Sequence, residues 1–230
     1  SGKCYLSLHT TNSSANRGAC VQNCRKTYLV TDKEDGHQFE IDNEYIMSPK
    51  DLCTIGFLDQ VLDAGSSILK LEGRGRSPEY VKIVTQCYRE AADSYIDGTY
   101  SKEKVKKWMK RLETVYNRGF WDGYYLGKKF GEWSKVHGSK ATKKKIYLGK
   151  AKKYFKKIKV AEFDLEAQQL EEGDDILITG KTTGVIEAVA KEMRLNNKKV
   201  KGVKKGDNFS MKFINLVRPS DKLYKIVNSE

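Results

Sequence analysis

Residues 66–98 read SSILKLEGRGRSPEYVKIVTQCYREAADSYIDG and contain the pattern of a strand followed by a helix. Residues 66–73 alternate leucine with charged side chains, as a half-buried strand does. Ser77 and Pro78 suit the start of a helix, because serine caps a helix and proline fits its first position. The apolar residues that follow recur every three or four positions: Val81, Val84, Tyr88, Ala91 and Tyr95. This order predicts a β/α architecture, with Cys87 in the core beside the apolar face of the helix.

The segments on either side continue this rhythm. Residues 49–62 predict another helix, because they too begin with a Ser-Pro pair and a glycine follows them. Residues 101–116 predict a third helix, which Ser101 caps in an imperfect capping box. Nearer the start, residues 28–30 and 39–41 predict a short hairpin joined by the turn-rich sequence DKEDGHQ.

Short segments typical of β-strands replace the helices after residue 140. Three of them follow a Gly-Asp or Ser-Asp turn, in EEGDDILI, KKGDNFSM and RPSDKLYKI. Such turns are typical of small barrels, although Gly-Asp is also common in turns of any kind. We predict an α+β chain: a partial (β/α)-barrel-derived N-terminal part at residues 1–135, then a small C-terminal β-barrel at residues 143–230. The first part has too few strands for a complete parallel sheet, so we expect residues upstream of it.

The net charge of +13 is concentrated in one part of the 230-residue chain. Between Lys128 and Lys159 there are thirteen lysines and one acidic residue. Such a run attracts a polyanion, and Tyr147, Tyr154 and Phe155 add surfaces on which bases could stack. The pattern favours contact with nucleic acid over the simpler alternative, a solvated surface that aids solubility. No apolar run is long enough to span a membrane, so we expect a cytoplasmic protein without a membrane partner.

Three of the five cysteines lie near the start of the chain, at Cys4, Cys20 and Cys24. An odd number of cysteines without a secretion signal disfavours a disulfide framework. The spacing supplies three soft ligands for zinc or for an iron–sulfur cluster, with Cys53 or a histidine as a candidate fourth ligand. From the spacing alone, metal ligands and buried structural cysteines are equally good interpretations.

A second set of candidate residues lies in the segment KLEGRGRSPEY, residues 70–80. Lys70, Glu72, Arg74 and Arg76 follow one another at the carboxyl end of the predicted strand, where β/α folds place their ligand sites. The intervening glycines let the backbone approach a ligand, and arginine binds phosphate or carboxylate groups through two nitrogens. The segment therefore predicts an anion site. The alternative is a cluster of surface ion pairs.

The aromatic segment YNRGFWDGYYLG, residues 116–127, is a third candidate. It either forms a stacking pocket for a base or anchors one domain to the other, and the sequence favours neither. Hydrolase motifs are scarce, because the three histidines form no H-E-x-x-H pair and no G-x-S-x-G occurs.

Five blocks of sequence occur in an order that resembles the collagenase-like peptidase family U-32. They are SGKCYLS, NRGACVQNCR, YIMSPKDL, KLEGRGRSPEYV and NRGFWDG. Within that family, the chain is most similar to the bacterial tRNA hydroxylation proteins that depend on prephenate. The resemblance implies a TIM-like barrel, of which residues 1–130 are the later part. It also implies that residues 143–230 form a barrel similar to those of translation factors.

The same resemblance implies a chemistry. Related members carry an iron–sulfur cluster (4Fe–4S) and hydroxylate the wobble uridine of tRNA to 5-hydroxyuridine, with prephenate as co-substrate. In this chain the matching cluster ligands are Cys4, Cys20 and Cys24, and a further family cysteine precedes them. Since the chain starts after that cysteine, we expect this fragment to lack the cluster and to be inactive.

The expected active centre contains Lys70, Glu72 and Arg74 as catalytic residues. The residues expected to bind substrate or tRNA are Arg76, Asn117, Arg118, Lys143, Lys144, Lys145, Lys152 and Lys153. Two other functions stay open: a collagenase-like peptidase, as the family name suggests, and a non-catalytic RNA-binding module.

Overall fold

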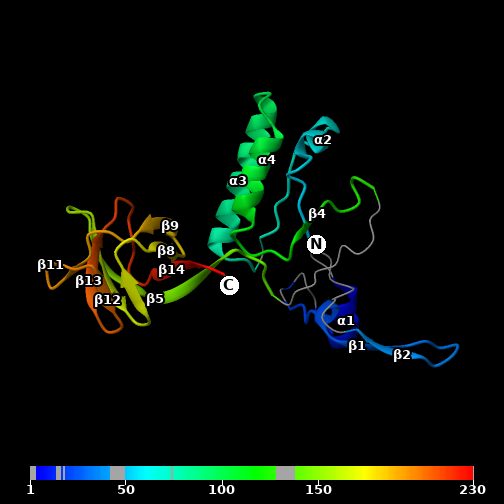
Figure 1. Ribbon diagram of the computed structural model, residues 1–230, viewed down its shortest axis with the longest axis horizontal. Coiled ribbons are helices and arrows are strands. Elements are labelled where there is room, and N and C mark those ends of the chain that lie inside the picture. Colours follow the sequence, from blue (N-terminus) through cyan, green and yellow to red (C-terminus); the bar gives the residue numbers. More distant parts are fainter. Residues whose placement is uncertain are drawn as a thin grey trace. The chain divides into compact units, whose positions relative to one another are not determined.

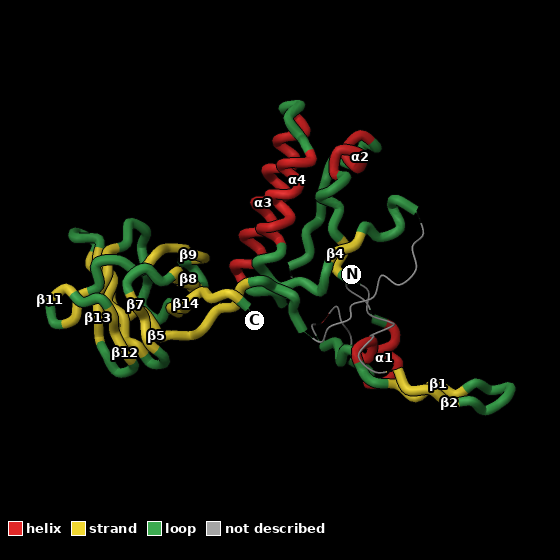
Figure 2. Tube along the Cα trace, viewed as in Figure 1, coloured by secondary structure: helices red, strands yellow, loops and turns green. Residues whose placement is uncertain are grey.

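The computed structural model describes residues 4–13, 17, 19–41, 50–73, 75–127 and 138–229. It divides into two compact units, one formed by residues 1–76 and 83–141 and the other by residues 77–82 and 142–230. Helices and short strands mix in the first unit, whereas the described residues from 142 onward form strands and loops alone (Figure 1, Figure 2). None of the helices described is both long and apolar enough to cross a membrane. The chain is a mixed α+β protein.

The described residues up to position 41 contain two short helices and a hairpin. Helix α1 spans Tyr5–Thr11, and the 3-10 helix η2 spans Asn23–Arg25. Strands β1 (Tyr28–Thr31) and β2 (Gln38–Ile41) pair antiparallel, which confirms the predicted hairpin. Gly36 has a φ of +73° and supplies the left-handed residue of the turn.

A parallel pair of strands lies in the first unit. Strand β3 (Asp51–Leu52) pairs with β4 (Phe120–Trp121), and helix α2 (Leu58–Asp63) follows β3. The prediction of a helix over residues 49–62 is therefore wrong for its first half, where β3 lies. Residue 49 itself lies outside the described residues. The backbone at both ends of β3 donates hydrogen bonds of 2.9 Å to the segment around β4. Pairing with a distant segment overrides the local helix signal.

Residues 66–73 form an extended segment rather than the predicted strand. The predicted alternation is present, because Leu69 and Leu71 are half-buried while Lys70 and Glu72 are exposed. Among the residues that the structure describes, no neighbouring strand forms a ladder with this segment. The sequence therefore predicts the two faces correctly but not the hydrogen-bonding state, which depends on a partner.

Helices α3 (Pro78–Ile96) and α4 (Lys102–Leu112) are confirmed, and they lie side by side (Figure 1). The Ser101 hydroxyl accepts a hydrogen bond of 3.3 Å from the Lys104 amide N–H, which caps α4 as predicted. Helix α4 ends at Leu112, before the predicted limit of residue 116. The predicted core position of Cys87 is also confirmed. Its fully buried side chain belongs to a cluster with Ile55, Leu58, Ala91, Trp108 and Leu112.

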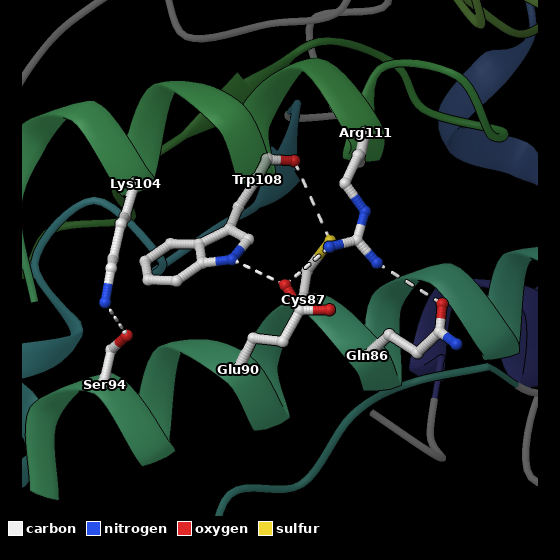
Figure 3. A network of polar contacts seen from close by, with 7 residues as sticks. All are labelled: Gln86, Cys87, Glu90, Ser94, Lys104, Trp108 and Arg111. Carbon is white, nitrogen blue, oxygen red and sulfur yellow. Dashed lines mark hydrogen bonds and ion pairs between the residues drawn. The ribbon is translucent and has the colours of Figure 1, made fainter. Parts of the chain in front are cut away.

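A row of polar contacts joins α3 to α4 (Figure 3). Glu90 Oε2 accepts hydrogen bonds from Trp108 Nε1 at 2.9 Å and from Arg111 Nη1 at 2.6 Å. Further along the two helices, Lys104 Nζ donates to Ser94 Oγ at 2.8 Å. These contacts satisfy polar groups beside the buried cluster, so they fix how the two helices pack.

In the second unit, the described residues from 142 onward form strands joined by loops. The strands are β5 (Lys143–Phe155), β6 (Val160–Leu165), β7 (Gln169–Glu171), β8 (Asp175–Gly180), β9 (Gly184–Val189), β10 (Arg194–Leu195), β11 (Lys198–Lys199), β12 (Gly202–Lys204), β13 (Asn208–Lys212) and β14 (Lys222–Asn228). Eight of them form an antiparallel sheet in the order β11-β10-β13-β6-β5-β14-β8-β9.

The predicted closed β-barrel is not detected in the described part of this unit. The sheet has two edges, β9 and β11, and these strands do not pair with each other there. Strands β7 and β12 pair with each other in a separate ribbon, so they do not link the two edges. The unit is therefore an open antiparallel sheet with an added ribbon.

The turns that precede β8, β13 and β14 share one geometry. In each, an aspartate carboxylate accepts a hydrogen bond of 2.7–2.8 Å from the amide N–H three residues earlier. The residue before the aspartate has a positive φ, between +70° and +102°, which glycine adopts readily. The three pairs are Gly173-Asp174, Gly206-Asp207 and Ser220-Asp221. This geometry confirms the repeated turn that the sequence predicts.

Alternate residues of β6 and β13 point into one apolar core. Ala161, Phe163 and Leu165 are buried on β6, and Phe209 and Met211 are buried on β13. The rings of Phe163 and Phe209 stack with their centres 5.5 Å apart. The intervening residues of both strands lie on the opposite face of the sheet.

Candidate functional site

Two buried polar side chains join helix α1 to the segment Cys20–Cys24. The Ser7 hydroxyl on α1 accepts a hydrogen bond of 3.2 Å from the Val21 amide N–H. The Asn23 side-chain amide donates to the Thr10 hydroxyl on α1 at 2.5 Å. These contacts hold the second cysteine-containing segment against the helix that follows the first cysteine.

The three N-terminal cysteines are partly exposed free thiols. Cys4 Sγ accepts a hydrogen bond of 3.5 Å from the Ser7 amide N–H, and Cys20 Sγ accepts one of 3.4 Å from Gln22. Soft thiolates with such hydrogen bonds suit an iron–sulfur cluster chemically. Among the described residues, however, no three His, Cys, Asp or Glu side chains are grouped so that they could hold a metal ion. The three cysteines do not form a metal site in this arrangement, and their role as cluster ligands, including that of Cys24, stays a prediction.

Cys53 directly follows β3, at the carboxyl end of the parallel pair. The Tyr88 hydroxyl lies 3.8 Å from its Sγ and accepts a hydrogen bond of 3.0 Å from the Thr54 amide N–H. Burial raises the pKa of the Cys53 thiol, and it also raises the pKa of the Tyr88 hydroxyl. Both groups are therefore neutral at pH 7, and this thiol is a poor nucleophile there.

The structure describes Lys70, Glu72 and Arg76 of the predicted anion site, whereas Arg74 lies outside the described residues. Lys70 and Glu72 are exposed on the extended segment. Arg76 lies against the aromatic segment, with its guanidinium carbon 3.9 Å from the centre of the Tyr116 ring. The sequence treats these as two separate candidates, and the structure brings one residue of each together.

Tyr116 also contacts a second arginine. The Arg118 guanidinium carbon lies 5.8 Å from the ring centre, and its Nε donates to the Tyr116 hydroxyl at 3.3 Å. Asp51 on β3 accepts a hydrogen bond of 2.9 Å from the Arg118 amide N–H. We call Arg76, Tyr116 and Arg118 the arginine–tyrosine cluster. Two guanidinium groups beside one ring suit a carboxylate, another anion or a planar group that stacks.

Asn117, expected to bind substrate, has only 3% of its surface exposed. Its side-chain amide donates to the Val115 carbonyl at 2.9 Å, and its Oδ1 accepts from the Gly119 amide N–H at 3.1 Å. Its own carbonyl accepts a hydrogen bond of 2.7 Å from Lys140. These bonds give Asn117 a structural role in the turn before β4, and its contact with substrate stays a prediction.

The five lysines expected to bind tRNA all lie on β5 and are exposed. Three of them are in ion pairs of 2.6–3.8 Å: Lys143 with Asp175, Lys145 with Glu79 and Lys152 with Asp164. The other two are Lys144 and Lys153. Each ion pair neutralises a lysine charge that would otherwise attract a polyanion. Strand β5 therefore binds a polyanion less well than its number of lysines indicates.

A model of the family described as "Peptidase family U32" matches residues 1–135 of the chain, more than half of its length. The chain therefore belongs to peptidase family U32. The five blocks of sequence predict this family correctly.

Several curated proteins are similar to the chain. A collagenase from Porphyromonas gingivalis is 54% identical over 230 residues, which are 100% of this chain and 56% of the relative. The uncharacterized protease MJ0090 from Methanocaldococcus jannaschii is 38% identical over 229 residues, 97% of this chain and 56% of the relative. The tRNA hydroxylation protein P1 from Bacillus subtilis is 34% identical over 152 residues, 62% of this chain and 35% of the relative. The collagenases are therefore nearer to this chain than the tRNA hydroxylation proteins, contrary to the order expected from the sequence blocks.

The chain spans about half the length of the first two of these relatives. A solved structure of the C-terminal domain of a protein described as a U32 peptidase, from Geobacillus thermoleovorans, is also similar. That match has a TM-score of 0.33 and 12% identity, and it covers 34% of this chain and 90% of the other.

Proposed function

We propose that the whole protein to which this chain belongs is a collagenase-like peptidase of family U32. The observation that carries the proposal is the 54% identity to the Porphyromonas gingivalis collagenase, which extends over all 230 residues. A second collagenase from Porphyromonas gingivalis is 52% identical over the same length. Because the chain covers only part of these relatives, the activity is proposed for the whole protein.

Within this chain, we assign substrate binding to the arginine–tyrosine cluster. A peptide presents carboxylate and carbonyl oxygens to which guanidinium groups donate charge-assisted hydrogen bonds. Asp51 holds the backbone of Arg118, and Asn117 holds the same turn, so the cluster is fixed before a substrate arrives. Lys70, Glu72 and Arg74, which precede Arg76 in the sequence, stay candidate catalytic residues.

The test measures cleavage of peptides from denatured collagen by the whole protein and its variants. Loss of a charge-assisted hydrogen bond costs about 1.5–3 kcal/mol, so Arg118→Ala should raise KM by about tenfold or more. Arg118→Lys should restore part of the affinity, because it keeps the charge but loses the fork of donors. Arg89→Ala is the matched control, because Arg89 is exposed on α3 and pairs with Asp93. An unchanged KM in Arg118→Ala would contradict the assignment of the cluster, even if the wild-type protein cleaves peptides.

A second candidate function is hydroxylation of tRNA. It is favoured by the 34% identity to tRNA hydroxylation protein P1 over 152 residues and by the joining of the cysteine-containing segments through Ser7 and Asn23. Under this candidate, Cys4, Cys20 and Cys24 would serve as iron–sulfur ligands, prephenate would be the co-substrate, and the protein would act in the cytoplasm.

Mass spectrometry of tRNA nucleosides from a deletion strain distinguishes the two candidates. Hydroxylation predicts that 5-hydroxyuridine is lost in the deletion strain, returns with the wild-type gene and does not return with Cys20→Ala. A peptidase predicts an unchanged nucleoside composition in all of these strains. Cys87→Ala serves as the cysteine control, because Cys87 is a buried core residue.

A further inference from the structure

A groove of about 560 Å³ crosses the antiparallel sheet of the second unit. Strands β6, β13 and β10 line it, together with the turn between β5 and β6 and the turn between β10 and β11. The lining residues that matter here are Phe155, Ile158, Arg194, Asn196, Asn197 and Asn208. This volume lies in the range of ordinary ligand sites.

The register of the strands arranges polar side chains along the groove. On β13, Phe209 is buried in the core, so Asn208 and Ser210 lie on the opposite face. Ser210 is opposite Arg194 on β10 and opposite Glu162 on β6. Three polar residues from three adjacent strands therefore form a row across the groove.

The two turns give the groove different sides. Asn196 and Asn197 form the two-residue turn between β10 and β11, and both have a positive φ, of +50° and +63°. Their side-chain amides contain donors and acceptors that match the edges of bases. On the other side, Phe155 at the end of β5 is 38% exposed, and Ile158 in the turn between β5 and β6 is 63% exposed. That side offers an aromatic and an aliphatic surface.

Positive charge is concentrated beside the same groove. Residues 142–230 contain 21 basic and 12 acidic residues, a difference of +9 out of the +13 of the whole chain. Exposed lysines lie in and next to the turn between β5 and β6, at Lys153, Lys156, Lys157 and Lys159. In the part of the chain that the structure describes, none of these four forms an ion pair, unlike three of the lysines assigned to tRNA from the sequence. Lys153 Nζ lies 5.0 Å from the centre of the Phe155 ring, which joins charge and aromatic surface.

We propose that this groove binds a single-stranded segment of nucleic acid. The phosphates contact the four lysines, one base stacks on Phe155, and the asparagines bind base edges. A carboxylate-rich peptide fits less well, because Glu162 and Glu192 line the groove itself. Phosphates avoid these two acids by lying outside the groove, on the lysines. The site uses no residue of the arginine–tyrosine cluster, so it stands or falls independently of peptide cleavage.

The first test measures fluorescence anisotropy of labelled oligonucleotides with the full chain. The probes are single-stranded RNA and DNA about twelve nucleotides long, the matching duplex, and a polyglutamate peptide of similar charge. We expect either single strand to bind more tightly than the duplex and the peptide. Phe155→Leu should weaken this binding about tenfold, which corresponds to about 1.4 kcal/mol of lost stacking, while Phe155→Trp should keep it. Equal binding by wild type and Phe155→Leu, or peptide binding as tight as that of the oligonucleotide, would overturn the proposal.

The second test measures how salt weakens the binding. Each phosphate contact on a single strand contributes about 0.7 to the slope of log K against log salt. The double variant Lys156→Ala/Lys157→Ala should therefore lower that slope by about 1.4. Lys204→Ala/Lys205→Ala is the matched control, because this adjacent exposed pair lies at the end of β12, which neither lines the groove nor belongs to the turn between β5 and β6. An equal fall of this slope in both double variants would show that the whole second unit attracts nucleic acid through its net charge, and it would contradict a defined site.

Discussion

Strand β5 contains a glycine, Gly149, whose replacement should break the pairing of β5 with β6. A Cβ atom at this position would lie 1.9 Å from the carbonyl oxygen of Asp164 on β6 and 3.1 Å from the amide nitrogen of Glu166. Non-bonded heavy atoms prefer separations of about 3.5 Å or more, so Gly149→Ala must move the two strands apart by roughly 1.5 Å. Both obstacles are backbone atoms, which cannot turn aside as the end of a flexible side chain could.

The cost of this change follows from the local contacts. The Leu148 carbonyl accepts hydrogen bonds from Glu166 at 2.7 Å and from Ala167 at 2.9 Å, and separation of the strands weakens both. Overpacking costs about 1–3 kcal/mol, and each weakened hydrogen bond adds about 1 kcal/mol. We therefore expect Gly149→Ala to lower the free energy of unfolding of the second unit by about 3–5 kcal/mol.

Urea unfolding of the full chain, followed by circular dichroism, measures this loss. Hydrogen exchange with mass spectrometry should assign the lost protection to peptides from β5, β6 and β14. Gly202→Ala on β12 is the matched control, because a Cβ atom there would lie 3.5 Å from the Leu170 carbonyl oxygen on β7, which is an ordinary contact distance. Its effect should stay within about 0.5 kcal/mol. A loss below about 1 kcal/mol in Gly149→Ala would refute the close approach of β5 and β6.

Three further predictions concern the packing of α3 against α4. Burial raises the pKa of Cys87 to about 11, so iodoacetamide at pH 8 should modify the partly exposed cysteines of residues 4–24 much faster than Cys87. Peptide mass spectrometry measures these rates of modification, and equal rates would contradict the burial of Cys87. The thiol pKa of Cys87 is higher in the folded than in the unfolded chain, so the buried thiol contributes to stability below about pH 8.5, and this contribution is lost as the pH rises toward 11. Between these pH values, the urea midpoint should fall more steeply in wild type than in Cys87→Ala. Glu90→Ala removes the acceptor of the Trp108 indole N–H and should lower stability by about 1–2 kcal/mol in thermal melts. Glu90→Gln keeps an acceptor, so it should lose less stability. Identical melts for the two variants would argue against this hydrogen bond.

Sequence patterns predicted the elements whose signals are local. The hairpin of residues 28–41 follows from a turn between two short β-rich segments, and α3 follows from a Ser-Pro start and regular apolar spacing. The turns before β8, β13 and β14 were also predictable, because the aspartate and the glycine or serine before it act within a few residues of each other. In all of these cases the residues that decide the structure are close together in sequence.

Elements that depend on distant partners were not predictable in the same way. Asp51 pairs through its backbone with the segment near residue 120, so the local helix signal at residues 49–62 did not decide the outcome. The carboxylate of Asp51 binds Arg118, 67 residues away, and no local pattern signals that contact. The lysine-rich sequence of β5 likewise predicted a continuous basic surface, but acids from other segments pair with several of these lysines.

The candidate site was predictable in its parts and not in its assembly. The sequence pointed to Arg76 as an anion-binding residue and left residues 116–127 open between a stacking pocket and a domain anchor. It could not show that Arg76 lies on the Tyr116 ring, because the two residues approach only through the fold. The sequence blocks predicted the family, whereas the relative similarity to collagenases and tRNA hydroxylation proteins required whole-chain comparison.

Cleavage of denatured collagen by the whole wild-type protein is the most direct measurement. Mass spectrometry of the digest should find new peptide ends that increase with enzyme concentration and time, and that form more slowly with Arg118→Ala than with Arg89→Ala at low substrate concentration. No new peptide ends at high enzyme concentration, together with loss of 5-hydroxyuridine from the tRNA of a deletion strain, would contradict the peptidase and favour the hydroxylation of tRNA.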